Sequence, residues 1–273
     1  MFGKSGVGSD GRAPRRTAGL SLVAALAALM VVPAAVTHGY ELHVPVLMYH
    51  RITKAPADAD LPQLWVAPRV FRAQLKALKD AGWRAITSEE LGRAVMGHRT
   101  VGPKRFVITI DDGARDGYTN AAPILEHIGM RATFCVVPGR AWRPWQLSFR
   151  HMRDLRAAGH EIANHSLSHA DLPSLSWAAL RKQVFEARRL IAERVGHAPR
   201  SFCYPYGRHD AAVRRVVAAA GHLLAYTTVD GAHQSTTDPM RSPRIRVSGS
   251  DRPTELLRRL RPYATGGGRT AGS

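Results

Sequence analysis

The sequence predicts an α/β fold in which a parallel sheet closes into a (β/α) barrel within one domain. Short apolar strands alternate with amphipathic helices along most of the 273 residues, and this alternation favours a parallel sheet covered by helices. Polar clusters recur where the predicted strands end, and in a barrel those ends converge on one site. The chain has no glycine-rich dinucleotide fingerprint and no phosphate loop.

The first half of the chain alternates between predicted strands and helices. The strand over 41–49 is apolar at its centre, and Phe71, Leu75 and Leu78 then recur at positions i, i+4 and i+7 of an amphipathic helix. Thr87 begins a capping box that starts the next helix. The elements predicted here are strands over 41–49, 84–87, 105–110 and 132–137, and helices from Phe71 to Gly82, after Thr87 and over 121–128.

The second half continues the same alternation. Phe149, Met152 and Leu155 mark a helix that stops at Gly159. A longer helix over 180–195 has one apolar face. The elements predicted here are strands over 161–163, 201–204, 224–227 and 244–247, and helices over 149–158, 180–195, 211–220 and 254–260.

The N-terminus has the pattern of an export segment. Three arginines within residues 12–16 precede an uncharged run over 17–36, and a basic region before an apolar one is typical of an export signal. Residues 32–34 offer only a poor cleavage site, and the run is near the length that spans a bilayer. We therefore expect residues 1–38 to be either a cleaved signal peptide or a retained membrane anchor. Both alternatives place the rest of the chain in the cell envelope or outside the cell.

The net charge of +18 limits the classes of partner. No nucleic-acid-binding motif is present, and the aromatic residues are not interleaved with the basic ones, so the sequence argues against a nucleic-acid partner. Attraction to an anionic cell envelope or membrane explains the charge better. The two cysteines, Cys135 and Cys203, lie in apolar strand-like runs. The favoured interpretation is two buried free thiols, and one disulfide is the alternative.

Two adjacent carboxylates, Asp111 and Asp112, follow the apolar strand that ends at Ile110. Consecutive strand residues point to opposite faces, but a turn at Gly113 lets both carboxylates reach one site. One carboxylate then binds a metal while its neighbour takes a proton from the attacking water. Taken alone, Asp-Asp-Gly is also typical of an ordinary turn.

Two histidines four residues apart, His165 and His169, follow the strand over 161–163. At this spacing both imidazoles can bind one ion, and two His with one Asp form a common metal set that leaves positions open for water and substrate. No Glu directly follows His165, so the metalloprotease helix motif is absent. The alternative is a pair of surface or core histidines.

A third cluster, Tyr204-Pro205-Tyr206-Gly207, lies at the end of the strand over 201–204. Aromatic side chains next to a rigid turn form a shelf on which sugars stack, and backbone N–H groups there can hold an oxyanion. The alternative is a plain transition from strand to turn.

In this order, the three clusters resemble the motifs of the polysaccharide deacetylase (NodB-homology) family, carbohydrate esterase family four. Residues 109–113 are similar to its first motif, with Ile110 where the family has Phe. Residues 165–169 match the His-Ser/Thr-x-x-His motif, and residues 205–207 match the Pro-Tyr-Gly that ends the third. The segment from 45 to 91 looks like a branch that acts on exported poly-N-acetylglucosamine-type polymers or the cell wall.

The resemblance implies a distorted (β/α) barrel and a domain organisation. The deacetylase domain is expected over 39–262, with a NodB-like core from about residue 104, followed by a flexible tail over 263–273. The resemblance further implies a divalent ion, usually Zn²⁺, held by Asp112, His165 and His169.

The resemblance also implies roles for the other residues of the motifs. Asp111 is the expected general base, and Tyr206, with Pro205 and Tyr204, is expected to contact the substrate or its oxyanion. Two departures matter. The family's base-orienting Arg is replaced by Cys203, for which Arg244 is the candidate replacement.

The usual Leu-x-His motif of the catalytic acid is absent after residue 247. His50, at the end of the first strand, is the candidate acid, with a structural hydrogen-bonded His as the alternative. Trp142 and Trp145 are candidates for a sugar platform, with helix packing as the alternative.

The implied function is hydrolysis of the amide C–N bond of N-acetyl groups on an N-acetylated polysaccharide of the cell surface or surroundings, releasing acetate. Two other functions stay open. One is an amidase or esterase that acts on a different acetylated substrate. The other is a non-catalytic glycan-binding envelope protein, for which the two departures from the family pattern argue.

Overall fold

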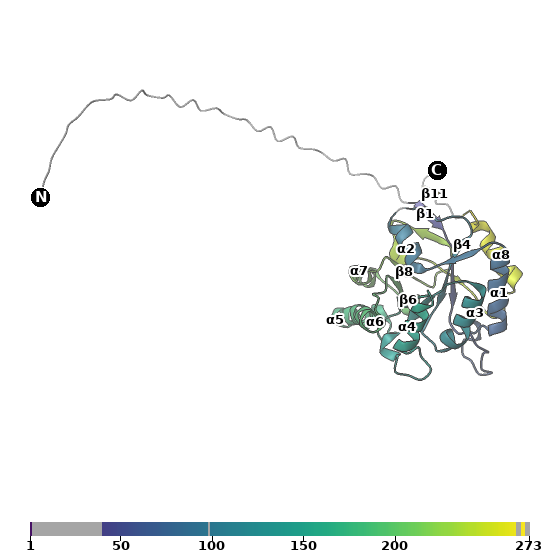
Figure 1. Ribbon diagram of the computed structural model, residues 1–273, viewed down its shortest axis with the longest axis horizontal. Helices are drawn as coiled ribbons and strands as arrows, with labels where there is room; N and C mark the ends of the chain where they lie inside the picture. Colours follow the sequence, from purple (N-terminus) through teal and green to yellow (C-terminus); the bar gives the residue numbers. More distant parts are fainter. Residues whose placement is uncertain (2–39, 98, 266–268, 271–273) are drawn as a thin grey trace, which may run out of the picture. The chain divides into compact units, whose positions relative to one another are not determined.

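Eight parallel strands form the central sheet of the computed structural model, which describes residue 1 and residues 40–97, 99–265 and 269–270 (Figure 1). Seven of them follow the order β10-β2-β4-β5-β6-β7-β8, and β3 pairs with β4. Their bounds are β2 (Val46–Tyr49), β3 (Arg84–Ile86), β4 (Arg105–Ile110), β5 (Thr133–Val136), β6 (Glu161–Asn164), β7 (Ser201–Cys203), β8 (Leu224–Tyr226) and β10 (Ile245–Arg246).

The sheet curls until its two edge strands approach each other. Tyr226, in β8, forms a parallel bridge with Ser242, and the backbone N–H of Arg244 donates to the carbonyl of Val229. These contacts join the β8 edge to the segment that leads into β10. The predicted barrel is therefore confirmed, and its distortion lies at this seam, where isolated contacts replace a full ladder.

A second, three-stranded sheet is antiparallel, in the order β11-β1-β9. It consists of β1 (Tyr40–His43), β9 (His233–Ser235) and β11 (Arg269–Thr270). The single strand expected over 41–49 is thus wrong, because the chain passes from β1 to β2 at Pro45, which has no N–H to donate to a ladder. β11 lies within the segment expected to be a flexible tail, where it pairs with the free edge of β1.

Eight α-helices accompany the strands in the described part of the chain (Figure 1). They are α1 (Pro68–Asp80), α2 (Ser88–Met96), α3 (Ala122–Ile128), α4 (Phe149–Ala157), α5 (Trp177–Arg181), α6 (Ala187–Val195), α7 (Ala211–Ala219) and α8 (Pro253–Leu260). The predicted capping box is present, since Thr87 and Glu90 satisfy each other's backbone N–H groups at the start of α2. The helix predicted over 180–195 is interrupted by a π-helical segment, Lys182–Glu186.

The barrel interior is built from alternate residues of the parallel strands. Val107, Ala163 and Tyr226 belong to one buried cluster, which lies in the interior enclosed by the curled sheet. Side chains two residues apart on a strand share a face, so Thr109 and Asp111 continue the inward face that Val107 begins. This periodicity brings a carboxylate to the inner carboxyl end of β4.

None of the helices in the described residues is long and apolar enough to cross a bilayer. The export segment expected at residues 1–38 lies, apart from Met1, outside the described residues.

Candidate functional site

A cavity of about 410 Å³ lies at the carboxyl ends of the barrel strands. All three sequence clusters reach it, through Asp111 and Asp112 after β4, His165 and His169 after β6, and Tyr206 after β7. The remaining lining residues are His50, Leu61, Gln63, Leu64, Thr228 and Arg246. Segments far apart in sequence therefore meet at one site, as the barrel prediction requires.

Asp112, His165 and His169 converge on one point. The Nε2 atoms of His165 and His169 lie 3.4 and 3.3 Å from Oδ1 of Asp112, and one ligand atom from each residue lies within 4.8 Å of the others. A tetrahedral ion with bonds of about 2.1 Å separates its ligand atoms by about 3.4 Å. The two distances to Asp112 match this spacing, so the three side chains are suited to hold a divalent ion.

The two histidines keep the carboxylate of Asp112 ionised. Burial alone would raise the pKa of Asp112, but hydrogen bonds with His165 and His169 outweigh it and hold the pKa well below its usual value. A carboxylate that stays ionised is what a cation requires.

The backbone of this group is strained in a way that points to function. Non-glycine residues rarely adopt positive φ, yet Asp112, Ser166, His169 and Tyr206 do so, with φ of 70°, 62°, 61° and 59°. Among the described residues the only other example is Lys104. Strained backbone concentrates at binding and catalytic sites, where surrounding contacts maintain it.

Hydrogen bonds behind the histidines fix their orientation. Nδ1 of His165 lies 2.6 Å from the carbonyl oxygen of Cys203, and because a carbonyl only accepts, this nitrogen carries the proton. Nε2 is then the nitrogen that faces Asp112. Loss of the Nε2 proton, which otherwise forms the hydrogen bond to Asp112, frees a lone pair for a metal. His169 is held through its backbone N–H, which donates to Oγ of Ser166, and Ser166 in turn donates its N–H to Asn164.

Asp111 forms a buried two-point ion pair with Arg244. Nη1 of Arg244 lies 2.9 Å from Oδ1, and Nη2 lies 2.8 Å from Oδ2. The guanidinium is itself held by Thr109 and by the carbonyl of Thr227. Burial alone would raise the pKa of Asp111, but Arg244 outweighs it and lowers the pKa. Arg244 therefore occupies the position expected of it, beside the candidate base.

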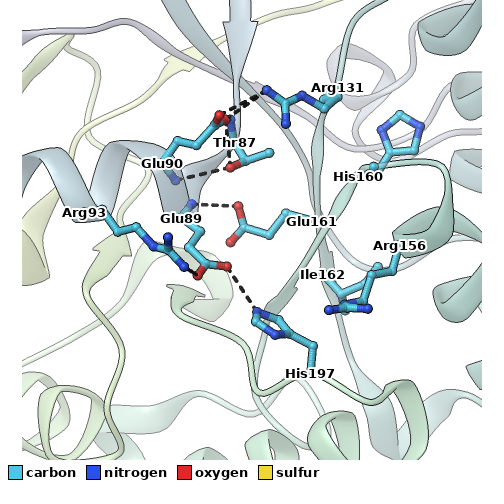
Figure 2. A pocket seen from close by; sticks show the side chains of 11 residues that line it. Thr87, Glu89, Glu90, Arg93, Arg131, Arg156, His160, Glu161, Ile162 and His197 are labelled. Atoms are coloured by element: carbon cyan, nitrogen blue, oxygen red, sulfur yellow. Dashed lines mark hydrogen bonds and ion pairs between the residues drawn. The ribbon is translucent and has the colours of Figure 1, made fainter.

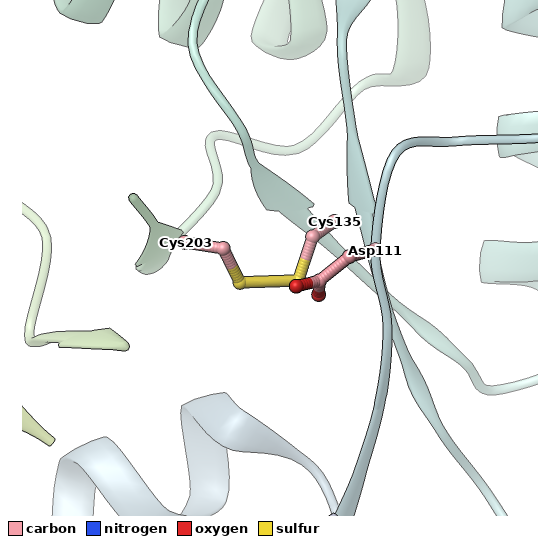
Figure 3. Close-up of side chains that lie close together, drawn as sticks. All are labelled: Asp111, Cys135 and Cys203. Atoms are coloured by element: carbon pink, nitrogen blue, oxygen red, sulfur yellow. A yellow bond between two sulfur atoms is a disulfide. The ribbon is translucent and has the colours of Figure 1, made fainter. Parts of the chain in front are cut away.

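A disulfide joins Cys135 and Cys203 beside Asp111 (Figure 3). Both residues are fully buried in the barrel interior, and Sγ of Cys203 lies 4.0 Å from Nη1 of Arg244. The interpretation as two free thiols was wrong, because the curled sheet brings strands β5 and β7 together across its interior. A disulfide offers no thiolate, so these sulfurs with Asp111 do not form a second metal site.

His50 lines the cavity at the end of β2. Its Nε2 lies 4.0 Å from Oδ2 of Asp111. Burial lowers the pKa of His50, and the carboxylates of Asp111 and Asp112 only partly offset this. The imidazole is therefore neutral near pH 7 and lies beside the carboxylate of the candidate base, Asp111.

The Pro-Tyr-Gly turn contributes less than the sequence suggests. Tyr206 is exposed, lines the cavity, and packs edge-on against His169 with ring centroids 4.6 Å apart. Tyr204 was wrongly placed at the substrate shelf, because it lies in the core and its hydroxyl donates to the carbonyl of Met240. Pro205 is also buried and lies outside the cavity lining.

Sequence reasoning missed the other lining residues. Arg246 is two residues from Arg244, and strand residues at i and i+2 share a face, so a signal for it existed. Leu61, Gln63 and Leu64 come from the segment between β2 and α1. Nothing in their local pattern indicated that this segment folds over the site.

A second cavity, of about 370 Å³, lies at the opposite, amino-terminal ends of β5, β6 and β7 (Figure 2). Its centre is the buried Glu161, which accepts hydrogen bonds from Thr133, Ser201 and the backbone N–H of Glu89. Glu89 lies in the first turn of α2, so these bonds attach the helix to the sheet. We interpret this network as structural.

Comparisons with known proteins find similarity to polysaccharide deacetylases. The model of the family described as polysaccharide deacetylase matches residues 98–225. The putative polysaccharide deacetylase YxkH of Bacillus subtilis (strain 168) is 26% identical over 204 residues, which are 75% of this chain and 71% of that protein.

A chitooligosaccharide deacetylase of Sinorhizobium fredii is 32% identical over 131 residues, covering 47% of this chain and 59% of that protein. Among solved structures, the Streptococcus pyogenes deacetylase PplD in complex with acetate superposes with a TM-score of 0.76. It is 26% identical, over 81% of this chain and 99% of that one.

Proposed function

Because this chain belongs to the polysaccharide deacetylase family, we propose that it hydrolyses N-acetyl groups of a polysaccharide of the cell surface or its surroundings. The observation that supports this most directly is the convergence of Asp112, His165 and His169 within 4.8 Å of one another. Asp111 and His50 line the same cavity. A metal triad with an adjacent carboxylate is suited to attack by water on a carbonyl group.

We propose that Asp112, His165 and His169 hold a divalent ion, with Zn²⁺ as the first choice because two imidazoles and one carboxylate suit it. When bound, such an ion lowers the pKa of water and polarises a carbonyl oxygen.

The chain's own residues supply the proton transfers. Asp111 is the base that takes a proton from the attacking water, and Arg244 keeps its carboxylate ionised and oriented. The backbone N–H at Tyr206 donates to the oxyanion. His50, 4.0 Å from Asp111, relays the proton to the amine as the C–N bond breaks. The products are acetate and a free amine on the sugar.

We propose that the enzyme works in the cell envelope or outside the cell. The export pattern of residues 1–38 and the net charge of +18 support this location, since an anionic envelope attracts a basic protein.

Acetate release from an N-acetylglucosamine oligomer tests the proposed function. The wild type loaded with Zn²⁺ is compared with Asp111→Asn, and bound metal is measured in both. We expect Asp111→Asn to bind metal but to lose turnover by at least about 10²-fold.

Asp230→Asn is the matched control, because this carboxylate is 78% exposed on its side chain and lies outside the cavity lining. Equal turnover in wild type and Asp111→Asn would reject the proposed base.

A further inference from the structure

Two tryptophans project into solvent from one loop that contacts the segments bearing the candidate metal ligands. Trp142 is 77% exposed and Trp145 is 60% exposed. Both belong to the segment over 138–147, here called the tryptophan loop, which follows the carboxyl end of β5. The alternative of helix packing is therefore wrong for these side chains. Exposed aromatic side chains grouped on one loop are typical of a binding surface.

The tryptophan loop is attached to the segment that contains Asp111 and Asp112. The backbone N–H of Leu147 donates to the carbonyl of Gly113 at 2.8 Å, and the N–H of Arg115 donates to the carbonyl of Trp145 at 2.9 Å. Leu147 is buried and anchors this end of the loop.

The other end of the tryptophan loop is attached to the segment between the two histidine ligands. The N–H of Gly139 donates to the carbonyl of Leu167 at 2.9 Å, and Nη2 of Arg140 donates to the carbonyl of Ser168 at 2.7 Å. The approach is so close that a Cβ at Gly139 would lie 2.4 Å from the carbonyl oxygen of Leu167. The backbone of the tryptophan loop is thus held at both ends by the segments that carry Asp112, His165 and His169.

Polar groups of the loop complement the two indoles. Nε1 of Trp142 donates to the carbonyl of Gly139 at 3.1 Å, which limits rotation of the ring. The guanidinium of Arg143 lies 5.4 Å from the ring centroid of Trp142 and 6.0 Å from that of Trp145. Within the described residues, no ion pair joins Arg143 to an acidic side chain, so no carboxylate neutralises its charge.

We propose that Trp142, Arg143 and Trp145 form a subsite for a pyranose unit of the polysaccharide, outside the catalytic cavity. The inference rests on the proposed function and deepens it, because it identifies the substrate as a chain of several sugars. Indole faces stack on the C–H face of a pyranose ring, and Arg143 donates hydrogen bonds to hydroxyl or acetamide oxygens. Because the loop is fixed in advance, little conformational entropy is lost on binding.

Binding energy at this subsite acts only on substrates long enough to reach it. We therefore compare 4-nitrophenyl acetate, which is small enough for the catalytic cavity alone, with an N-acetylglucosamine hexamer. The variant is Trp142→Ala with Trp145→Ala. Trp177→Ala on α5 is the control, because Trp177 is also 55% exposed but does not belong to the tryptophan loop.

We expect the double variant to keep wild-type turnover of 4-nitrophenyl acetate and to lose about tenfold in kcat/KM on the hexamer, mostly through KM. Two lost ring contacts are of this size. Trp177→Ala should match the wild type on both substrates. The proposed subsite would be overturned if the double variant keeps the wild-type kcat/KM on the hexamer. It would also be overturned if the double variant loses kcat/KM equally on both substrates. A metal-loaded wild type that turns over neither substrate would instead reject the proposed function, and the subsite with it.

Discussion

At the residue scale, Asp111 and Arg244 depend on each other, because both side chains are buried and each neutralises the other's charge. The resemblance places an arginine that orients the candidate base at the position of Cys203, and Arg244 approaches Asp111 from the β10 side of the barrel instead. Removal of one member of a buried pair leaves an uncompensated charge, and this costs more than the pair contributes.

Arg244→Gln should therefore lower both stability and activity. We expect the free energy of unfolding to fall by about 3–5 kcal/mol. The pKa of Asp111 should rise, since Arg244 lowers it, and kcat should fall by at least about 10²-fold. Steady-state kinetics on folded protein checks this, with Arg244→Lys as the milder variant that keeps the charge but loses the two-point contact. An unchanged kcat in Arg244→Gln would contradict the role given to Arg244.

His50→Ala should lower turnover without affecting metal uptake. His50 lies beside Asp111 and is not one of the three convergent ligands, so only proton transfer is lost, at a cost of about 10²- to 10⁴-fold in kcat. His127→Ala, an exposed histidine on α3, is the control. If His50→Ala keeps the wild-type kcat, His50 has a structural role and takes no part in proton transfer.

The residues that the sequence could predict are those in short contiguous motifs. Asp111, Asp112, His165 and His169 fall within two such motifs, and the barrel brings these motifs together. Tyr204 was misplaced because it packs with Phe202 in the core, whereas Tyr206, two residues later, reaches the cavity. Arg246 and Leu61 were missed because they reach the cavity only through the closure of the barrel and the path of a loop.

At the element scale, the disulfide connects two strands that are separated by β6. Cys135 lies in β5 and Cys203 in β7, 68 residues apart in sequence. A crosslink restricts the unfolded chain, and for a loop of this length the expected stabilisation is about 4 kcal/mol.

The variant Cys135→Ser with Cys203→Ser should lower the free energy of unfolding by about 2–4 kcal/mol. Urea denaturation without reductant measures it, and wild type with reductant should approach the variant. Identical unfolding midpoints and slopes for wild type and variant without reductant would show that the bond does not stabilise the fold.

The network around Glu161 predicts a pH dependence of stability. Burial raises the pKa of Glu161 from 4.5 to about 7. Between these values the folded chain binds a proton that the unfolded chain has released, so the contribution of Glu161 to stability falls as pH rises from 4.5 to about 7.

The free energy of unfolding of wild type minus that of Glu161→Gln should therefore decrease across this range, because the amide does not titrate. Chemical denaturation at a series of pH values measures the difference. A difference that is constant with pH, or that increases, would contradict the raised pKa.

The presence of the helices and strands could be predicted better than the points at which they break or pair. Apolar periodicity indicated the strands and helices of the barrel, and the capping box at Thr87 indicated where α2 begins. Strand β1 pairs with β9 and β11, which lie 190 or more residues further along the chain. The break between β1 and β2 at Pro45 depends on this distant pairing. Local pattern contains no information about such partners.

At the scale of the whole molecule, the barrel explains why the site exists. Parallel strands end at one edge, so clusters that are far apart along the chain meet around one cavity, while the opposite edge holds the network of Glu161. The class of fold could be predicted because alternating strands and helices allow few arrangements. The seam at Ser242 could not, because it consists of isolated contacts.

Acetate release by metal-free protein, followed as Zn²⁺ is added back, tests the central claim most directly. With an N-acetylglucosamine oligomer as substrate, we expect no release without the ion and a rise to a plateau at one ion per chain. Release that is equally fast without metal, or absent at every loading, would contradict the account.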